Sequence, residues 1–486
     1  MKLNQVLVPF FFGLLGILSF APFSIKFTIF ISYAYLINLI LSSKKNSFLK
    51  VFSWGFGHWG FGMSWVIVSV YYYGETSIAL SLLIYILLII ILSIVFTSPL
   101  TLIKPLINYV NISNKYSKIL LISALFSVSE LTRYYLLNGV PWLIPGNIYL
   151  DTISQNIYPI FGVSALSIMI YILCAGYAVN LKKKAQYFLL GLVLISIFPE
   201  NKTATAQDGV LVSIIQPSSD PFLKYEDNYS YKIESNLDAL INKTSKESQL
   251  IVIPEAELPY VLNSKRFKSF IENTQKSNKI IMGAWNYDEN KLYNVIYSSK
   301  YTETYKKKHL VPFGEYIPFF ERLRGIIKFF DLPMSNVSKG SNNQKNLNIL
   351  NNVKVSTPIC FDIAFSNTIR KMNKSSLLMI NISNDTWFGN SIGPYQHLNL
   401  ARIRSIENNR WTIRSTNDGI SAIISNNGTI VNYLEKGVSD ILEDRVSLIS
   451  NRSFYNKIGY LFIYLFIIMT SLILTIKYIW KKINFS

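Results

Sequence analysis

The stretch Val353-Lys-Val-Ser-Thr-Pro-Ile-Cys360 decides the fold of the polar part of this chain. It is a short strand-like run that ends abruptly at a cysteine, and helical spacing begins near Ala364. Short apolar runs of this kind are typical of strands buried inside a sheet. A turn from strand to helix exposes the side chain at its apex and aims backbone N–H groups at a bound carbonyl group. We therefore predict a buried sheet with a candidate nucleophile at one strand end.

Cys360 has two competing interpretations. The chain contains 2 cysteines, and the other, Cys174, lies within an apolar run that is typical of a membrane-embedded segment. Cys360 therefore has no partner for a disulfide within the polar region. A free cysteine is more often a small buried apolar residue than a nucleophile, so the residues around Cys360 must decide.

Similar apolar runs recur through residues 201–456 and end in polar residues. We predict strands at 210–215, 250–253, 279–285, 293–297, 377–382, 411–416 and 421–425. Segments with helical spacing lie between them at 230–246, 264–277 and 397–409. Alternation of buried strands with helices indicates an α/β domain, and this length is sufficient to bury its own core.

The rest of the chain is far more apolar. Half of all residues (50%) are hydrophobic and 15% are charged, yet the net charge is +19. A bilayer crossing needs about 20 apolar residues, and we predict spans at 6–22, 26–43, 51–73, 77–99, 118–138, 157–181, 185–199 and 458–477. The expected domains are thus 1–200 with seven spans, 201–456 as the α/β domain, and 457–486 with the last span and a tail.

The loop charges predict the orientation of these spans. Lysines cluster on one side, at Lys44, Lys45, Lys50, Lys104, Lys115, Lys118, Lys182, Lys183, Lys184, Lys481 and Lys482. Positive loops remain in the cytoplasm, so both termini are expected there and the α/β domain on the opposite side. Much of the net charge is explained by this orientation and by attraction to anionic lipid, and the remainder lies on the α/β domain. No nucleic-acid-binding motif is present, and no nucleic-acid partner is expected.

Three predicted strand ends carry reactive side chains. Glu255 follows the strand at 250–253, Lys307 follows the stretch 293–305, and Cys360 ends its own strand. A carboxylate that accepts a proton, a thiol that attacks and a cation that stabilises an oxyanion together suit acyl transfer. Each residue taken singly is more often structural than catalytic, so the case depends on their joint placement.

Longer motifs surround these residues, and through them the chain resembles the nitrilase superfamily with its Glu-Lys-Cys triad. More closely, it resembles the bacterial apolipoprotein N-acyltransferase family. The matching strings are Pro254-Glu255 with Pro259, Tyr305-Lys-Lys-Lys-His-Leu-Val-Pro-Phe-Gly-Glu315, Pro358-Ile-Cys360-Phe-Asp, Ser383-Asn-Asp-Thr-Trp-Phe-Gly389, Gly393-Pro-Tyr-Gln-His397 and Thr416-Asn-Asp-Gly419. In the apolar part, Gly62-Met-Ser-Trp65-Val and Gly139-Val-Pro-Trp142 also match.

The resemblance implies a fold and a role for each residue. It implies a membrane α-helical bundle of about eight spans joined to an extracytoplasmic, nitrilase-like αββα sandwich. Glu255 is then the general base, Lys307 the oxyanion stabiliser and Cys360 the nucleophile. Glu315 matches a further glutamate of the family site and is expected to orient Lys307.

The resemblance also implies the reaction. An acyl chain passes from a membrane phospholipid to Cys360 as a thioester, and then to the α-amino group of the N-terminal diacylglyceryl-cysteine of a lipoprotein. The expected location is the bacterial inner (cytoplasmic) membrane, with the catalytic domain on the periplasmic side and the protein as a monomer. No cofactor is expected, and His58, His309 and His397 show no metal-ligand spacing. We expect His397 either to form a hydrogen bond near the site or to have a purely structural role.

Some residues depart from the family pattern. Ile253 and Glu257 flank the proposed base, where the family usually has Trp and a small residue, and Glu257 brings a second carboxylate close to Glu255. Phe361 and Asp362 follow the cysteine in place of the more usual Tyr and Glu.

In the fifth predicted span, Glu130 and Arg133 are one turn apart and are expected to form a structural pair, because isolated charges are costly in a membrane.

Two alternative functions remain open from the sequence. A membrane-anchored nitrilase-type amidase would use the same triad to hydrolyse a small amide and would form no lysophospholipid. A transporter or receptor with an outer ligand-binding domain would place charged residues deep in several spans, and here such residues are few.

Overall fold

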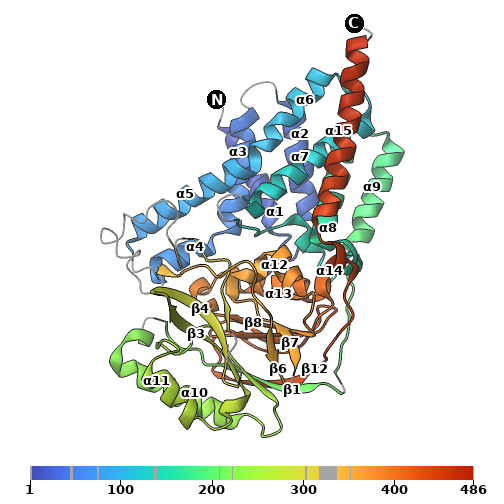
Figure 1. Ribbon diagram of the computed structural model, residues 1–486. Helices are drawn as coiled ribbons and strands as arrows, with labels where there is room; N and C mark the ends of the chain where they lie inside the picture. Colours follow the sequence, from blue (N-terminus) through green and yellow to red (C-terminus); the bar gives the residue numbers. More distant parts are fainter. Residues whose placement is uncertain are drawn as a thin grey trace. The chain divides into compact units, whose positions relative to one another are not determined.

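The computed structural model describes residues 3–43, 47–73, 76–135, 139–206, 208–221, 223–300, 304–312, 314–316, 336–350 and 352–484. The chain divides into two compact units (Figure 1). The helical unit comprises Met1–Ile67, Ala79–Asn201 and Ile458–Ser486, and the α/β unit comprises Val68–Ile78 and Lys202–Lys457.

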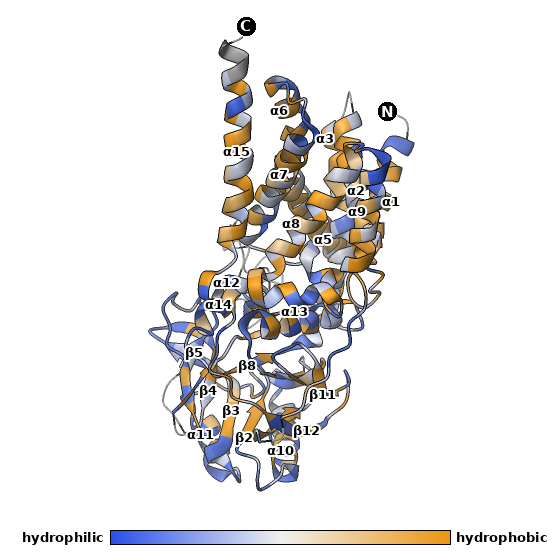
Figure 2. Ribbon diagram, turned by 90° about the vertical axis from the view of Figure 1, so that its right-hand side faces the viewer, coloured by the Kyte–Doolittle hydropathy of each residue, from blue (hydrophilic) through white to orange (hydrophobic). Residues whose placement is uncertain are grey.

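Each predicted span overlaps a helix of the helical unit, but residues 68–73 of the span at 51–73 belong to the α/β unit, and residues 136–138 of the span at 118–138 lie outside the described residues. The long helices are α1 (Asn4–Ile17), α2 (Thr28–Ser42), α3 (Ser47–Gly62), α5 (Ile78–Thr97), α7 (Lys115–Tyr135), α8 (Tyr158–Ala178), α9 (Lys183–Ser196) and α15 (Leu461–Asn484). Shorter helices are α4 (Trp65–Val68) and α6 (Ile103–Val110). Apolar residues predominate along the helices of this unit (Figure 2).

Within the described residues, 3 helical stretches are long and apolar enough to cross a membrane, namely Ile78–Val110, Ile153–Ala178 and Leu461–Trp480. Asn4–Ile17 and Thr28–Ser42 are apolar but shorter. The structure therefore confirms membrane-compatible helices in this part of the chain. The number of spans and their orientation stay predictions.

The expected pair Glu130 and Arg133 lies buried within the helical unit. The Glu130 carboxylate accepts hydrogen bonds from the hydroxyl groups of Tyr171 and Tyr464, and an Arg133 guanidinium N–H donates to the Trp142 carbonyl oxygen. The Arg133 guanidinium also lies 5.0 Å from the centroid of the Trp59 ring. The two charges are thus held mainly through aromatic and backbone partners from other parts of the helical unit.

The α/β unit is built on two six-stranded mixed sheets. One sheet has the order β12-β1-β2-β3-β4-β5 and the other β11-β10-β9-β8-β7-β6. The bounds are β1 Val210–Gln216, β2 Leu250–Ile253, β3 Ile280–Asp288, β4 Lys291–Ser298, β5 Thr304–Lys306, β6 Leu347–Ile349, β7 Val353–Ser356, β8 Leu378–Ser383, β9 Thr412–Thr416, β10 Ser421–Ile424, β11 Ile430–Leu434 and β12 Asp440–Val446. Strands β1, β2 and β3 run parallel, and so do β7, β8 and β9.

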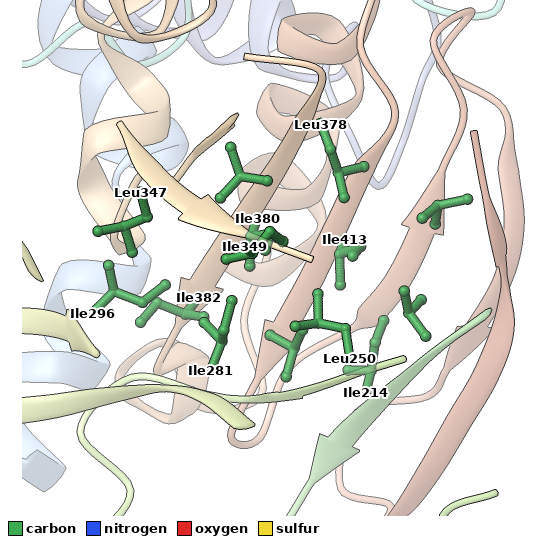
Figure 3. Close-up of a cluster of buried hydrophobic side chains, with 14 of the residues drawn as sticks. Ile214, Leu250, Ile281, Ile296, Leu347, Ile349, Leu378, Ile380, Ile382 and Ile413 are labelled. Carbon is green, nitrogen blue, oxygen red and sulfur yellow. The ribbon is translucent and has the colours of Figure 1, made fainter. Parts of the chain in front are cut away.

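The two sheets pack face to face around one apolar core (Figure 3). Side chains along a strand alternate between its two faces, and β2 shows this clearly. Leu250 and Val252 point into the core between the sheets, whereas Ile251 and Ile253 pack against helices on the outer face. Those outer helices are α10 (Asp227–Lys243) and α11 (Lys265–Asn273).

The second sheet is covered in the same way. Helix α13 (Gly393–Asn408) packs against β9 and α12 (Ser366–Met372) packs against α13. The predicted sandwich of two sheets with helices outside is therefore the fold of this unit. A segment from the N-terminal half also belongs to it, because Ser69 Oγ donates a hydrogen bond to the Trp387 carbonyl oxygen at 2.6 Å.

The central strands were predicted well and the edge strands were not. Strands β5, β6, β11 and β12 lay outside the predicted runs, since their mixed polar sequences lack the apolar run of a strand buried on both faces. The helix expected near Ala364 is also different. The chain forms a short 3₁₀ helix, Cys360–Ala364, before α12 begins at Ser366.

Replacing a fully buried residue of the inter-sheet core should destabilise the α/β unit. Ile380 is 0% exposed and contacts the core from β8 (Figure 3). We expect Ile380→Ala to lower the free energy of unfolding by about 2–5 kcal/mol, because it removes apolar contacts and leaves a cavity. Urea unfolding of the protein in detergent measures this. Tyr433→Ala, at a side chain 53% exposed, serves as the control and should change the free energy by less than about 0.5 kcal/mol.

Candidate active site

The ends of three strands bring the predicted residues together. Glu255 lies two residues after β2, Lys307 directly after β5, and Cys360 opens the 3₁₀ helix that follows β7. The Lys307 ammonium nitrogen is 2.9 Å from Glu255 Oε1. The charges of both residues act on the Cys360 thiol. The sequence placed these groups on separate strand ends, and the fold joins them in one site.

The turn after β2 depends on a close approach of the neighbouring strand. Ala256 has a left-handed backbone with φ +45°, and the Gly283 N–H on β3 donates to the Pro254 carbonyl oxygen at 3.1 Å. A Cβ atom at Gly283 would lie 2.6 Å from the Cα atom of Glu255, which is too close for any side chain. Glycine at position 283 is therefore needed so that β3 can lie close enough to the backbone of Glu255.

The Lys307 side chain is 2% exposed and sits between two carboxylates. Its ammonium group donates to Glu255 Oε1 at 2.9 Å and to Glu315 Oε1 at 2.8 Å. Burial by itself would lower the pKa of Lys307. The two carboxylates outweigh burial and raise that pKa well above its ordinary value. The two carboxylates therefore stabilise the charged form of Lys307 inside the protein.

Glu255 is fixed through both of its oxygen atoms. Oε1 accepts hydrogen bonds from Lys307 and from Asn294 Nδ2 at 2.6 Å, and Oε2 accepts from the backbone N–H of Asn384 at 2.9 Å. Neither asparagine was named as a site residue from the sequence. Asn384 lies within the Ser383-to-Gly389 string, whereas Asn294 had no signal beyond its position in a strand.

The Glu315 carboxylate lies against the Lys307 ammonium group in the structure. Glu315 Oε2 accepts a hydrogen bond from the Val311 N–H at 2.8 Å, which leaves Oε1 directed at the ammonium group. Burial and the nearby Glu255 carboxylate raise the pKa of Glu315, although Lys307 opposes them. Glu315 is thus held for contact with Lys307 rather than with solvent.

Cys360 is partly exposed and has an unusual backbone conformation. Its φ of +46° lies in the left-handed region, which costs a residue with a side chain of order 1–3 kcal/mol and often marks functional sites. Desolvation and the Glu255 carboxylate raise the pKa of the Cys360 thiol well above its ordinary value, against the opposing charge of Lys307. The resting thiol is therefore protonated and needs a base before it can attack.

A buried hydrogen-bonded cluster of His397, Asp385 and Arg414 contacts the backbone of Cys360. One ring nitrogen of His397, Nε2, is 3.2 Å from the Cys360 carbonyl oxygen, and the other is 2.9 Å from Asp385 Oδ1. Arg414 donates to Asp385 Oδ2 at 2.6 Å. Burial would raise the pKa of Asp385, but Arg414 and His397 hold it below its ordinary value. His397 therefore contacts the backbone of the candidate nucleophile.

The residues after the cysteine have structural partners. Asp362 accepts hydrogen bonds from the His309 N–H at 2.8 Å and from the Tyr305 hydroxyl at 3.0 Å. Burial raises the pKa of Asp362 to about 6. Asp362 thereby connects the turn of Cys360 to the chain segment that carries Lys307.

In the part of the chain that the structure describes, no group of 3 or more His, Cys, Asp or Glu side chains could hold a metal ion.

Comparison with known proteins gives two family matches. Residues 12–176 match the model of the apolipoprotein N-acyltransferase N-terminal domain, and residues 211–448 match that of carbon-nitrogen hydrolases. A protein of Pasteurella multocida named apolipoprotein N-acyltransferase is 30% identical over 95% of this chain and 93% of its own length. Proteins of the same name from Shewanella oneidensis and Haemophilus influenzae are each 29% identical, over 94% and 99% of this chain and 92% and 97% of theirs.

The pKa of Cys360 can be tested by alkylation. Because the pKa is raised, the rate of iodoacetamide labelling at Cys360 should keep rising from pH 7 to about pH 10 without a plateau. Glu255→Gln removes a negative charge and lowers the thiol pKa, so labelling at pH 8 should become about tenfold faster. A plateau below pH 8, or slower labelling of Glu255→Gln, would contradict the protonated thiol. Cys360→Ser gives the background from Cys174, which is buried.

Proposed function

This chain belongs to the apolipoprotein N-acyltransferase family, and from that premise we propose that Cys360 carries the acyl group between donor and acceptor. One observation supports this most. The positively charged Lys307 donates a hydrogen bond to the Glu255 carboxylate at a strand end. The charges of both residues act on the thiol of Cys360, which is protonated and has a left-handed backbone conformation. These are the groups that acyl transfer through a thioester requires.

In the first step, the Cys360 sulfur attacks the ester carbonyl carbon of a membrane phospholipid. The thiol proton passes to Glu255, whose hydrogen bonds from Asn294 and Asn384 hold the carboxylate in place. The C–O bond of the ester then breaks. The departing alkoxide takes the proton from Glu255 and leaves as a lysophospholipid, and the acyl chain remains on sulfur as a thioester.

Negative charge develops on the carbonyl oxygen during this attack. Lys307 and the backbone N–H groups at the start of the 3₁₀ helix would stabilise that charge, because they are already oriented inside the protein. Glu315 keeps Lys307 in position through its 2.8 Å contact. His397 keeps the Cys360 turn in position through the backbone carbonyl group.

In the second step, the α-amino group of a diacylglyceryl-cysteine at the N-terminus of a lipoprotein attacks the thioester. Glu255 accepts a proton from the amine and returns it to the departing Cys360 thiolate. An amide bond forms and the C–S bond breaks, which restores the free thiol. A thioester is suited to this exchange, since amines attack it more readily than they attack an oxygen ester.

The membrane part explains how such substrates would be reached. Both donor and acceptor are lipid-anchored, so an enzyme embedded in the same bilayer meets them by lateral diffusion. We propose eight spans, both termini in the cytoplasm and the α/β unit on the periplasmic side of the inner membrane, with a monomer as the active form. The lysine distribution and the apolar helices of the helical unit support this arrangement.

An assay with both substrates tests this proposal and separates it from an amidase. Purified protein in detergent is given a phospholipid with a labelled acyl chain and a peptide bearing diacylglyceryl-cysteine with a free amine. We expect N-acylated peptide and lysophospholipid in equal amounts. Hydrolysis of a soluble amide without lysophospholipid, or labelled fatty acid as the main product in the presence of peptide, would contradict the proposal.

The role of Glu255 predicts a graded loss of activity. Glu255→Gln should lower the rate of acyl transfer by about 10²–10⁴-fold, because the protonated thiol loses its base. Glu315→Gln keeps an oxygen facing Lys307 and should lower the rate less. Glu234→Gln is the matched control, since it removes a carboxylate from an ion pair with Arg266 on the outer face of the same unit. Equal rates for Glu255→Gln and Glu234→Gln would overturn the assignment of the base.

A further inference from the structure

A second buried lysine–glutamate pair lies beside Glu255, and the proposed mechanism does not use it. Lys224 belongs to a short 3₁₀ helix, Leu223–Tyr225, and Glu257 follows the turn after β2. Their side chains are 3% and 0% exposed. Lys224 Nζ is 4.0 Å from Glu257 Oε2, a charge pair that is enclosed by protein.

The contacts of this pair converge on the turn that carries the base. The Lys224 ammonium group donates a hydrogen bond to the carbonyl oxygen of Ala256, the left-handed residue between Glu255 and Glu257. Glu257 Oε1 accepts a hydrogen bond from Ser219 Oγ at 2.5 Å, and the Ser219 N–H donates to Asn417 Oδ1 at 2.9 Å. Among the described residues, Glu257 Oε2 has no hydrogen-bond partner.

Burying such a pair is costly. Burying two charges removes their hydration, and a buried pair at 4.0 Å recovers only part of that cost. Burial lowers the pKa of Lys224 and raises the pKa of Glu257, with each partner opposing the shift of the other. The negative charge of Glu255 also raises the pKa of Lys224, so the Lys224–Glu257 pair and the Lys307–Glu255 pair interact electrostatically.

We propose that Lys224 is a positioning residue for Glu255, acting through the Ala256 carbonyl group and through compensation of the Glu257 charge. It holds the left-handed turn that directs the Glu255 carboxylate toward Lys307 and Cys360. Its positive charge also keeps the Glu257 carboxylate from repelling Glu255. This inference rests on the proposed role of Glu255 as the base.

The pH dependence of the reaction depends on the charged and titratable groups that surround Glu255 and Glu257. Glu257 is faced by Lys224 and Tyr225. Glu255 is faced by Lys307, Glu315, Cys360 and also Lys224 and Tyr225. Removal of Lys224 leaves a like charge beside Glu255 that no cation compensates, and a like charge makes a carboxylate easier to protonate.

The test measures the rate of Cys360 acylation by phospholipid at a series of pH values in the full-length protein. For Lys224→Met we expect a rate at least tenfold lower at neutral pH, with the acidic limb of the pH profile about one unit higher. In Lys224→Met/Glu257→Gln the limb should return to that of the original protein. The rate should recover in part, because the hydrogen bond to Ala256 is still missing.

Lys276→Met is the matched control, because Lys276 also holds backbone carbonyl groups, including that of Thr244 at 2.6 Å, but lies away from the turn. It should leave both rate and pH profile unchanged. Thermal unfolding of every variant shows that the α/β unit is still folded. The inference is wrong if the acidic limb of the pH–rate profile does not move in Lys224→Met. It is also wrong if Lys224→Met/Glu257→Gln does not return that limb to its original position.

Glu255→Gln, measured in parallel, distinguishes this failure from failure of the proposed function. If Glu255→Gln acylates at the original rate, the assignment of the base is wrong and the role of Lys224 falls with it. If Glu255→Gln is slow while Lys224→Met is normal, only the inference about Lys224 is overturned.

Discussion

A buried ammonium group is the constraint on which the site depends. Lys307 is enclosed by protein and hydrogen-bonded to Glu255 and Glu315, and a lysine without such partners would lose its charge on burial. Both carboxylates need further donors of their own, which Asn294, the Asn384 backbone and the Val311 backbone supply. The positive charge therefore requires an extended set of positioned groups, and these come from several elements of the α/β unit.

The sandwich fold supplies those groups because strands from both sheets end near one another. Strands β2, β4 and β5 bring Glu255, Asn294 and Lys307 from one sheet. The segments after β7 and β8 bring Cys360 and Asn384 from the other. The apolar core between the sheets fixes their distance, so the positions of the candidate catalytic groups are set by packing rather than by the loops that carry them.

Sequence reasoning recovered the parts of this arrangement that leave a local signal. Apolar runs predicted the central strands, and abrupt polar ends pointed to Glu255, Lys307 and Cys360. Asn294 could not be found in this way, because an asparagine inside a strand looks the same whether it faces solvent or a buried carboxylate. Lys224 is more than 30 residues from Glu257 in the sequence, and nothing local indicates that they meet. The edge strand β12 was missed because polar and apolar residues are mixed along both of its faces.

The central claim is that Cys360, activated by Glu255, carries the acyl chain. Intact-protein mass spectrometry after exposure to phospholipid, with the amine acceptor withheld, tests it most directly. We predict a mass increase equal to one acyl chain, located at Cys360 by peptide mapping, absent in Cys360→Ala and lost when the acceptor peptide is added. An unmodified Cys360 in a protein that still transfers acyl chains to the peptide would contradict the account.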